Sequence, residues 1–174
     1  LIIDQQNLDK FYITAPRGEI FDVNGQKIAE TKLEPHLFIN MRKINNQNSS
    51  DYRQVIQYNF PELETKEINE IFESKDILNF VVNLSSVEYE VRNNLLTNFD
   101  AFLIIDLPIR NYIKDELFSH TVGYLGIPNQ DEFNKFQNAL GNNQVGKNGL
   151  ERYYEEYLSG IPGELIFSGS EIVD

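Results

Sequence analysis

The segment from residue 145 to residue 164 constrains the fold more than any other part of the chain, because it carries the signals for both ends of a helix. Asn148 is a good N-cap residue, and Glu151 stands three positions later, where its carboxylate can accept a bond from the N–H of the cap. Gly160 can adopt the left-handed conformation that ends a helix, and Pro162 prevents the helix from continuing. We therefore expect a loop, a capped helix, a sharp stop and then a strand. Apolar residues at helical spacing predict one buried stripe on this helix, formed by Leu150, Tyr154, Tyr157 and Leu158.

Residues 15–30 form a second segment with strong local signals. Asn24 and Gly25 stand between two short strand-like runs, and this pair is typical of a two-residue hairpin turn in which both residues have positive φ. The segment predicts a hairpin over residues 17–29.

Together these two segments resemble the N-terminal, non-catalytic module of class B penicillin-binding proteins, which is also called the dimerisation or pedestal domain. The family's first motif is R-G-x-I-x-D followed by a turn with Gly, and its last motif is G-K-x-G-L-E-x-x-Y-E-x-x-L-x-G-x-x-G. The first motif is matched by Arg17, Gly18, Ile20, Asp22 and Gly25. The last motif is matched by Gly146, Lys147, Gly149, Leu150, Glu151, Tyr154, Glu155, Leu158, Gly160 and Gly163.

A middle motif of the family, R-x-Y-P-x-G ending in His and then G-Y, is matched in part. Ile113 stands at the usual Pro and Asp115 at the usual Gly, so the local turn departs from the family pattern. The G-K-x-G-L-E form of the last motif is similar to the cell-elongation branch of the family rather than to the division branch. The matching residues of the middle motif are Arg110, Tyr112, His120, Gly123 and Tyr124.

The resemblance implies an elongated pedestal with a base of residues 1–35 and 101–174 and a head lobe of about residues 36–100. Such a module positions a D,D-transpeptidase domain on the extracytoplasmic side of the bacterial membrane, and family members carry a transmembrane anchor just upstream. The implied partners are the protein's own C-terminal transpeptidase domain, a membrane glycosyltransferase, a rod-shape scaffold protein and a second copy in a homodimer. Exposed apolar residues of the head lobe would bind partner proteins, and the candidates are Tyr52, Val55, Phe72 and Phe80.

The bulk composition excludes several classes of partner and site. The chain has 174 residues, 41% of them hydrophobic, which is enough for a globular fold with a core. Its formal net charge of −12 argues against binding to nucleic acid or to an anionic membrane surface. The absence of cysteine excludes disulfides, thiolate metal sites and a cysteine nucleophile. No apolar run approaches the roughly 20 residues that a membrane-spanning helix needs.

Strand and helix signals are intermixed without regular βαβ alternation, which favours an α+β fold. Ser85 and Glu88 form a capping-box pattern that predicts the start of a helix, and Pro108 is expected to end the strand that begins at Ala101. Further helices are expected from about Asp51 with Ser50 as cap, from about Thr65, over residues 114–124, and from Asn129 through Leu140. Further strands are expected at residues 37–40, 80–84, 164–167 and 171–173, with residues 4–14 as a helix or an extended lead-in.

One pattern suggests a nucleotide-binding loop, but two of its required features are missing. Residues 141–147 match the G-x-x-x-x-G-K half of such a loop. Asn148 occupies the position where Mg²⁺ needs a Ser or Thr hydroxyl, and a helix rather than a strand is expected before the loop. We therefore interpret the loop as structural.

The histidines and carboxylates also give no strong catalytic pattern. His36 and His120 are too few for a zinc site, and we interpret His120 as a packed, hydrogen-bonded residue of the pedestal. Asp22 and Asp106 would form an acid–base pair only by coincidence of folding. The glutamates at positions 151, 155 and 156 are interpreted mainly as a helix cap and a solvated helix face.

The catalytic domain of the family requires the motifs S-x-x-K, S-x-N and K-[ST]-G. None of the three occurs in this chain. We therefore predict a non-catalytic module without cofactor or metal. The alternatives left open are an independent enzyme that acts on phosphate or glycan, and a self-association domain.

Arg17 is expected to join the first motif to the last. The resemblance implies that these two motifs pack together at the base. A partly buried arginine can bind a carboxylate through two N–H groups, and this geometry fixes the orientation of the elements that carry them. We predict such a pair, with Glu151 as the first choice of partner and Asp22 as the second.

Overall fold

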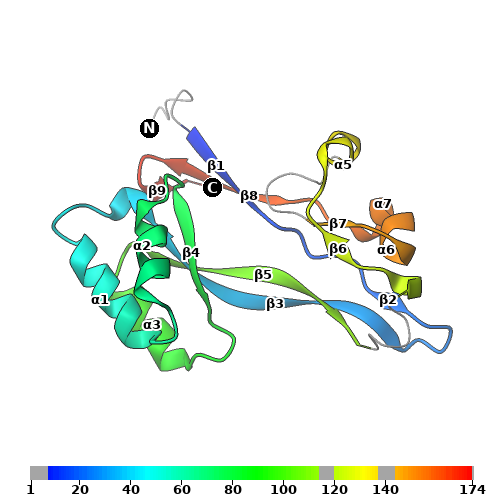
Figure 1. Ribbon diagram of the computed structural model, residues 1–174, viewed down its shortest axis with the longest axis horizontal. Helices are drawn as coiled ribbons and strands as arrows, with labels where there is room; N and C mark the ends of the chain where they lie inside the picture. Colours follow the sequence, from blue (N-terminus) through cyan, green and yellow to red (C-terminus); the bar gives the residue numbers. More distant parts are fainter. Residues whose placement is uncertain (1–7, 114–119, 137–143, 174) are drawn as a thin grey trace. The chain divides into compact units, whose positions relative to one another are not determined.

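The computed structural model of the protein describes residues 8–113, 120–136 and 144–173 (Figure 1). Helices and strands are intermixed in these residues, which confirms the expected α+β class. The strands are β1 (Leu8–Ile13), β2 (Ile20–Phe21), β3 (Lys27–Asn40), β4 (Leu78–Asn83), β5 (Phe102–Tyr112), β6 (Leu125–Gly126), β7 (Val145–Gly146), β8 (Gly163–Ser168) and β9 (Glu171–Ile172). The helices are α1 (Ser49–Asn59), α2 (Thr65–Glu73), α3 (Tyr89–Asn98), α5 (Gln130–Lys135), α6 (Gly149–Tyr153) and α7 (Glu155–Leu158), with a 3-10 turn at Met41–Lys43.

The chain forms two compact units. The first contains residues 34–106 together with residues 8, 9 and 166–173. The second contains residues 10–33, 107–113, 120–136 and 144–165. None of the helices in the described ranges is both long and apolar enough to cross a membrane.

Strand β3 organises the four-stranded sheet of the chain. It pairs antiparallel with β2, where Ile20 lies opposite Ala29, and with β4, where Phe38 lies opposite Phe80; it also pairs with β5. The expectation that Pro108 ends a strand was wrong, because β5 continues to Tyr112. Strand β3 is the one partner of β5 among the described strands, and an edge strand accommodates proline because the missing N–H can face away from its partner.

The first unit has the larger hydrophobic core of the two, in which helices α1, α2 and α3 lie together (Figure 1). Leu37 and Ile39 alternate along β3 and enter this core, as period-2 patterning predicts. Each of the three helices contributes a buried side chain, namely Ile56, Ile68 and Leu95. This core therefore holds the C-terminal end of β3 in the first unit.

The structure corrects most of the expected partner-binding residues of the head lobe. Tyr52 is only 4% exposed, and its ring packs edge-on against two phenylalanine rings, so its assignment as a surface contact was wrong. Val55 and Phe72 are half-buried and pack against the same core. Phe80 is 50% exposed and is the one of the four that presents a large apolar surface.

The turn of the first hairpin differs from the predicted two-residue type. Gly25 has a φ of +76°, but no described non-glycine residue, Asn24 included, has a positive φ. The carboxylate of Asp22 instead accepts hydrogen bonds from the backbone N–H groups of Asn24 and Gln26, at 2.8 and 2.9 Å. The side chain of Asp22, rather than two left-handed residues, therefore closes this turn.

The helix caps were predicted with mixed success. The expected cap at Asn129 is confirmed and Glu132 completes a capping box, but α5 ends at Lys135, before the expected end of the helix. The expected box of Ser85 is wrong, because Glu88 is itself the N-cap of α3 and the Ser85 hydroxyl donates to Glu34. Helix α1 begins one residue before its expected cap, at Ser49. Most of the helix expected at residues 114–124, and Leu140, lie outside the described residues.

Candidate functional site

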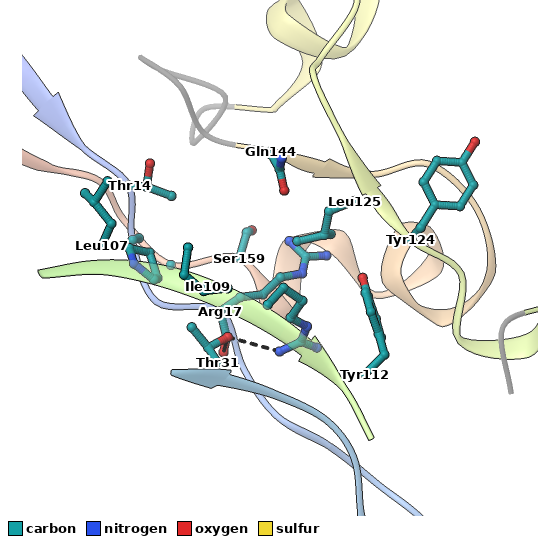
Figure 2. A pocket seen from close by; sticks show the side chains of 14 residues that line it. Thr14, Arg17, Thr31, Leu107, Ile109, Tyr112, Tyr124, Leu125, Gln144 and Ser159 are labelled. Carbon is teal, nitrogen blue, oxygen red and sulfur yellow. Dashed lines mark hydrogen bonds between the residues drawn. The ribbon is translucent and has the colours of Figure 1, made fainter. Parts of the chain in front are cut away.

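Two arginines and two glutamates form a buried cluster in the second unit, beside the cavity drawn in Figure 2. Arg17 lies between β1 and β2, and its Nε donates to Glu151 Oε2 at 2.5 Å while its Nη2 donates to Glu155 Oε2 at 2.7 Å. Arg110 of β5 donates from Nε to Glu151 Oε1 at 2.9 Å. The side chains of both arginines are 6% exposed, and those of the glutamates are 0 and 2% exposed. The predicted pair of Arg17 and Glu151 is confirmed, and Asp22, the second choice, binds its own turn.

Backbone groups tie this arginine–glutamate cluster to all three sequence motifs. The N–H of Gly146 donates to Glu155 Oε2 at 2.7 Å, and Arg17 Nη2 donates to the carbonyl of Glu151 at 2.8 Å. Arg110 Nη1 donates to the carbonyl of Gly18 at 2.8 Å. The first, middle and last motifs therefore meet at one point, although sequence reasoning had assigned no contact to Arg110.

Thr31 of β3 connects the arginine–glutamate cluster to the four-stranded sheet. Its hydroxyl donates to the carbonyl of Arg17 at 2.8 Å and accepts from Arg110 Nη1 at 3.1 Å, which is the dashed line in Figure 2. The cavity beside these groups has a volume of about 470 Å³, and Figure 2 shows Leu107, Ile109 and Leu125 among its lining residues. The charged groups on its wall are bound to carboxylates, so their arrangement suits a structural clamp rather than proton transfer.

The cluster pairs two arginines with two glutamates, so its formal charges balance. Burial lowers the pKa of Arg17, but the hydrogen bond and charge of Glu155 and the charge of Glu151 outweigh this effect, so the pKa lies above its ordinary value. Burial raises the pKa of Tyr112 to about 12, and the charge of Glu151 adds to the increase. Arg17 therefore stays charged and Tyr112 stays neutral around neutral pH, as a structural clamp requires.

The expected buried stripe of the closing helix was wrong. Tyr154 and Tyr157 are 44 and 85% exposed, whereas Glu151 and Glu155 occupy the buried face. The element also divides into α6 and α7 at Tyr154, which has φ −104° and ψ 25°. A carboxylate pair at i and i+4 can occupy a buried face when arginines supply the opposite charge. The spacing of the two glutamates was the signal in the sequence that could have indicated this.

The structure also corrects the roles predicted for Asn148 and Gly160 in the same segment. Asn148 is the N-cap residue, but its side chain makes no cap bond, and the Glu151 side chain binds arginines instead. Gly160 does not have a positive φ. A Cβ at Gly160 would lie 2.6 Å from the carbonyl oxygen of Pro16, so the position requires glycine for close approach of two chain segments.

A second ionic group surrounds Glu132. Its carboxylate accepts from Lys147 Nζ and from Arg152 Nη1 at 2.7 Å, and from the backbone N–H of Asn129 at 2.9 Å. The hydrogen bond from Lys147, followed by those from Asn129 and Arg152, lowers the pKa of Glu132 to about 2. The lysine of the phosphate-loop pattern is thus bound to a carboxylate, in agreement with a structural interpretation.

This low pKa predicts a pH-dependent contribution of Glu132 to stability. A carboxylate with an ordinary pKa of 4.5 and a folded value of about 2 stabilises the protein above about pH 4.5, and this stabilisation is lost as the pH falls toward 2. We expect Glu132→Gln to melt at a lower temperature than the wild type at pH 7, and the difference to shrink between pH 4.5 and 2. Thermal melts across this range check the prediction. Glu156→Gln, at an exposed position of α7, should show the same dependence of melting temperature on pH as the wild type. If Glu132→Gln also showed the wild-type dependence, Glu132 would not be the group that causes it.

The two histidines lie in different environments. His120 is exposed, so its interpretation as a packed residue was wrong. The Nδ1 atom of His36, which is 7% exposed, lies 2.8 Å from the carbonyl oxygen of Glu34. Within residues 8–113, 120–136 and 144–173, no group of three or more His, Asp or Glu side chains could hold a metal ion.

The comparison with known protein families decides the assignment of the chain. The family model of the penicillin-binding protein dimerisation domain matches residues 12–168. The chain belongs to this family. The three motifs that meet at the arginine–glutamate cluster therefore lie within one matched dimerisation domain.

Curated relatives of this dimerisation domain are much longer proteins. Peptidoglycan D,D-transpeptidase MrdA of Acinetobacter baumannii is 29% identical over 84% of the chain and 23% of its own length. The MrdA protein of Haemophilus influenzae is 40% identical over 31% of the chain and 9% of its own length. Stage V sporulation protein D of Bacillus subtilis is 26% identical over 87% of the chain and 21% of its own length. The chain thus spans less than a quarter of each of these relatives.

Solved structures support the fold of the dimerisation domain. The complex between the penicillin-binding protein PBP2 and MreC from Helicobacter pylori has a TM-score of 0.69 at 20% identity, with 96% of this chain and 33% of that chain covered. A second structure of PBP2 from the same organism has a TM-score of 0.62 at 21% identity, with 91% of this chain and 31% of that chain covered.

Proposed function

We propose that this dimerisation domain is the non-catalytic pedestal of an elongation-type peptidoglycan D,D-transpeptidase. Two of its relatives are MrdA transpeptidases, and the three motifs of a transpeptidase site do not occur in the chain. In this role the domain positions the catalytic part of a longer polypeptide on the extracytoplasmic side of the membrane. The observation that carries the proposal is the arginine–glutamate cluster, because it holds the three family motifs in one buried joint.

We assign the base of the pedestal to the second unit, which contains the cluster, and the head to the first unit. A buried, bidentate Arg17 fixes the relative orientation of the segments around it, which is the property that a supporting base needs. The head then provides the surface for a partner of the MreC type, in line with the PBP2–MreC complex of Helicobacter pylori. Binding of a membrane glycosyltransferase belongs to the same proposal.

Two measurements test this function. A fluorescent penicillin should label the longer polypeptide but not the 174-residue chain, and labelling of the chain itself would refute the non-catalytic role. Calorimetry with the MreC-type protein of the same organism should show binding to the chain.

Phe80 of β4 is our candidate contact for that partner. An exposed aromatic side chain at the centre of an interface commonly contributes most of the affinity, so Phe80→Ala should weaken binding about tenfold or more. Leu96→Ala is the matched control, because Leu96 of α3 is 44% exposed in the same unit. Equal affinity of the Phe80→Ala variant and the control would exclude Phe80 from the interface.

A further inference from the structure

The outer surface of α6 and α7 presents a group of exposed aromatic rings, which we name the tyrosine face and define by Tyr153, Tyr154 and Tyr157. Tyr153 and Tyr157 are 80 and 85% exposed, and Tyr154 is 44% exposed. The rings contact one another edge to face, with centroids 4.8 Å apart for Tyr153 and Tyr154 and 6.3 Å apart for Tyr154 and Tyr157. The family motif accounts for one of these rings, Tyr154, and the arginine–glutamate cluster uses none of them.

The exposure of these rings follows from the ionic anchoring of the helix segment. Glu151 and Glu155 bind the arginines and so hold one face of the segment inward. Tyr153 and Tyr157, each two positions after one of these glutamates, are therefore directed outward. Tyrosine is an amphipathic side chain that contributes binding when its ring is covered and its hydroxyl remains hydrogen-bonded. Rings this exposed contribute little to the core, and clustered exposed apolar surface marks a binding site more often than scattered residues do.

Two hollows flank the tyrosine face. One has a volume of about 500 Å³ and is lined by Tyr153, Tyr157 and Arg152. The other has a volume of about 490 Å³ and continues along the chain to Ile161, which is 93% exposed. Both are lined by Lys135, Phe136 and Glu156, so they form neighbouring parts of one elongated surface.

The chemistry of this surface combines ring faces with polar and charged groups of both signs. Lys135, Arg152 and Glu156 lie on the walls, so the surface does not concentrate the negative charge of a chain with net charge −12. A polysaccharide fits this combination, since the C–H face of a pyranose ring packs on an aromatic ring while its hydroxyl and amide groups bond to polar side chains. Carboxylates on attached peptides would meet the cation of Lys135, since Arg152 already donates to Glu132.

We propose that the tyrosine face binds the glycan strand of peptidoglycan. This inference rests on the proposed function, because the relatives named as peptidoglycan transpeptidases supply the class of ligand. Tyr153 and Tyr157 stack on successive sugar rings, and Lys135 and Glu156, which line both hollows, bind the acetamide and hydroxyl groups. The surface holds uncrosslinked strands near the catalytic part of the polypeptide rather than acting on them.

Titration of the 174-residue chain with chitotetraose, and with muramidase-released glycan fragments that keep their peptides, tests the proposal. Calorimetry and NMR should show saturable binding in the millimolar range that perturbs signals of α6 and α7. Tyr153→Ala and Tyr157→Ala should each weaken binding about tenfold, which is the effect of losing one stacked ring. Tyr58→Ala is the matched control, because Tyr58 of α1 is also 85% exposed, and it should leave affinity unchanged. Equal melting temperatures of all three variants would show that folding is unaffected.

Three results would overturn the proposal. The first is no saturation by either glycan, or equal affinity of the Tyr153→Ala, Tyr157→Ala double variant. The second is light scattering that shows a dimer of the wild type and a monomer of the double variant, which would assign the face to a second copy. The third is slow nitration of these tyrosines in the longer polypeptide but fast nitration in the chain, which would mean that another part of the polypeptide covers them. Penicillin labelling and binding of the MreC-type protein do not depend on these rings. A negative result with the glycans would therefore refute glycan binding without refuting the pedestal function.

Discussion

Replacing Arg17 with alanine is expected to lower the free energy of unfolding by about 3–5 kcal/mol, the cost of leaving a buried charge without its partner. The substitution leaves Glu155 with no arginine in the cluster and Glu151 with Arg110 alone. Both carboxylates are almost fully buried, so water cannot replace the lost guanidinium without opening the second unit. Urea denaturation followed by circular dichroism measures the change.

Lys10→Ala is the matched control for this prediction. Lys10 also pairs with a glutamate, Glu164, at 2.7 Å, but the two side chains are 49 and 36% exposed. Exposed pairs contribute about 1 kcal/mol or less, so the control should be close to the wild type. If Arg17→Ala lost no more stability than Lys10→Ala, the arginine–glutamate cluster would not be the joint of the domain. Adding Glu155→Gln to Arg17→Ala should restore part of the lost free energy of unfolding, because it removes the unpaired charge of Glu155.

Gly146→Ala is expected to destabilise the domain by roughly 3 kcal/mol or more, at the upper end of the range for overpacked positions. A Cβ at this position would lie 2.3 Å from the carbonyl carbon and oxygen of Glu151 and 2.5 Å from the nitrogen of Arg152. All three atoms belong to the backbone of α6, so a side-chain rotation cannot relieve the clash. Moving α6 would also disturb the bond from the Gly146 N–H to Glu155.

Gly163→Ala provides the comparison for Gly146. Gly163 belongs to the same motif, its φ is not positive, and a methyl group there would lie 3.8 Å from Ile13 Cβ, which is an ordinary contact. Alanine at this position should change stability by less than about 1 kcal/mol, because it restricts the unfolded chain without a clash. Thermal melts of both variants separate the two cases. Similar melting temperatures would show that β7 and α6 are not held as closely as the structure places them.

Local signals predicted the elements better than they predicted burial. The hairpin and the helices α1 and α2 could be anticipated, because each depends on nearby residues. The Arg17–Glu151 pair could be anticipated because the family resemblance implies that the first and last motifs pack together. The buried face of α6 and α7 could not, since hydrophobic periodicity assigns carboxylates to solvent and takes no account of partners more than a hundred positions away. The same limit explains Tyr52, whose burial depends on aromatic neighbours from a distant strand and loop.

Backbone contacts between distant segments were equally hidden from local reasoning. Gly160 was interpreted from its position after a helix, yet its environment is set by Pro16. Pro108 was interpreted as a strand stop, yet its effect depends on whether the strand lies at the edge of a sheet. In both cases the residue type indicated an unusual backbone position, but contacts with residues distant in the sequence determined what that position was.

The two arginines of the cluster lie far from the glutamates in the sequence, at separations of 134 positions for Arg17 and Glu151 and 41 positions for Arg110 and Glu151. A polypeptide that emerges from its N-terminus during synthesis or export therefore exposes both cations long before either counter-charge is available. Contacts of such long sequence separation form late in folding. Folding of the second unit is consequently tied to delivery of the segment that carries Glu151 and Glu155, which closes the cluster around both arginines.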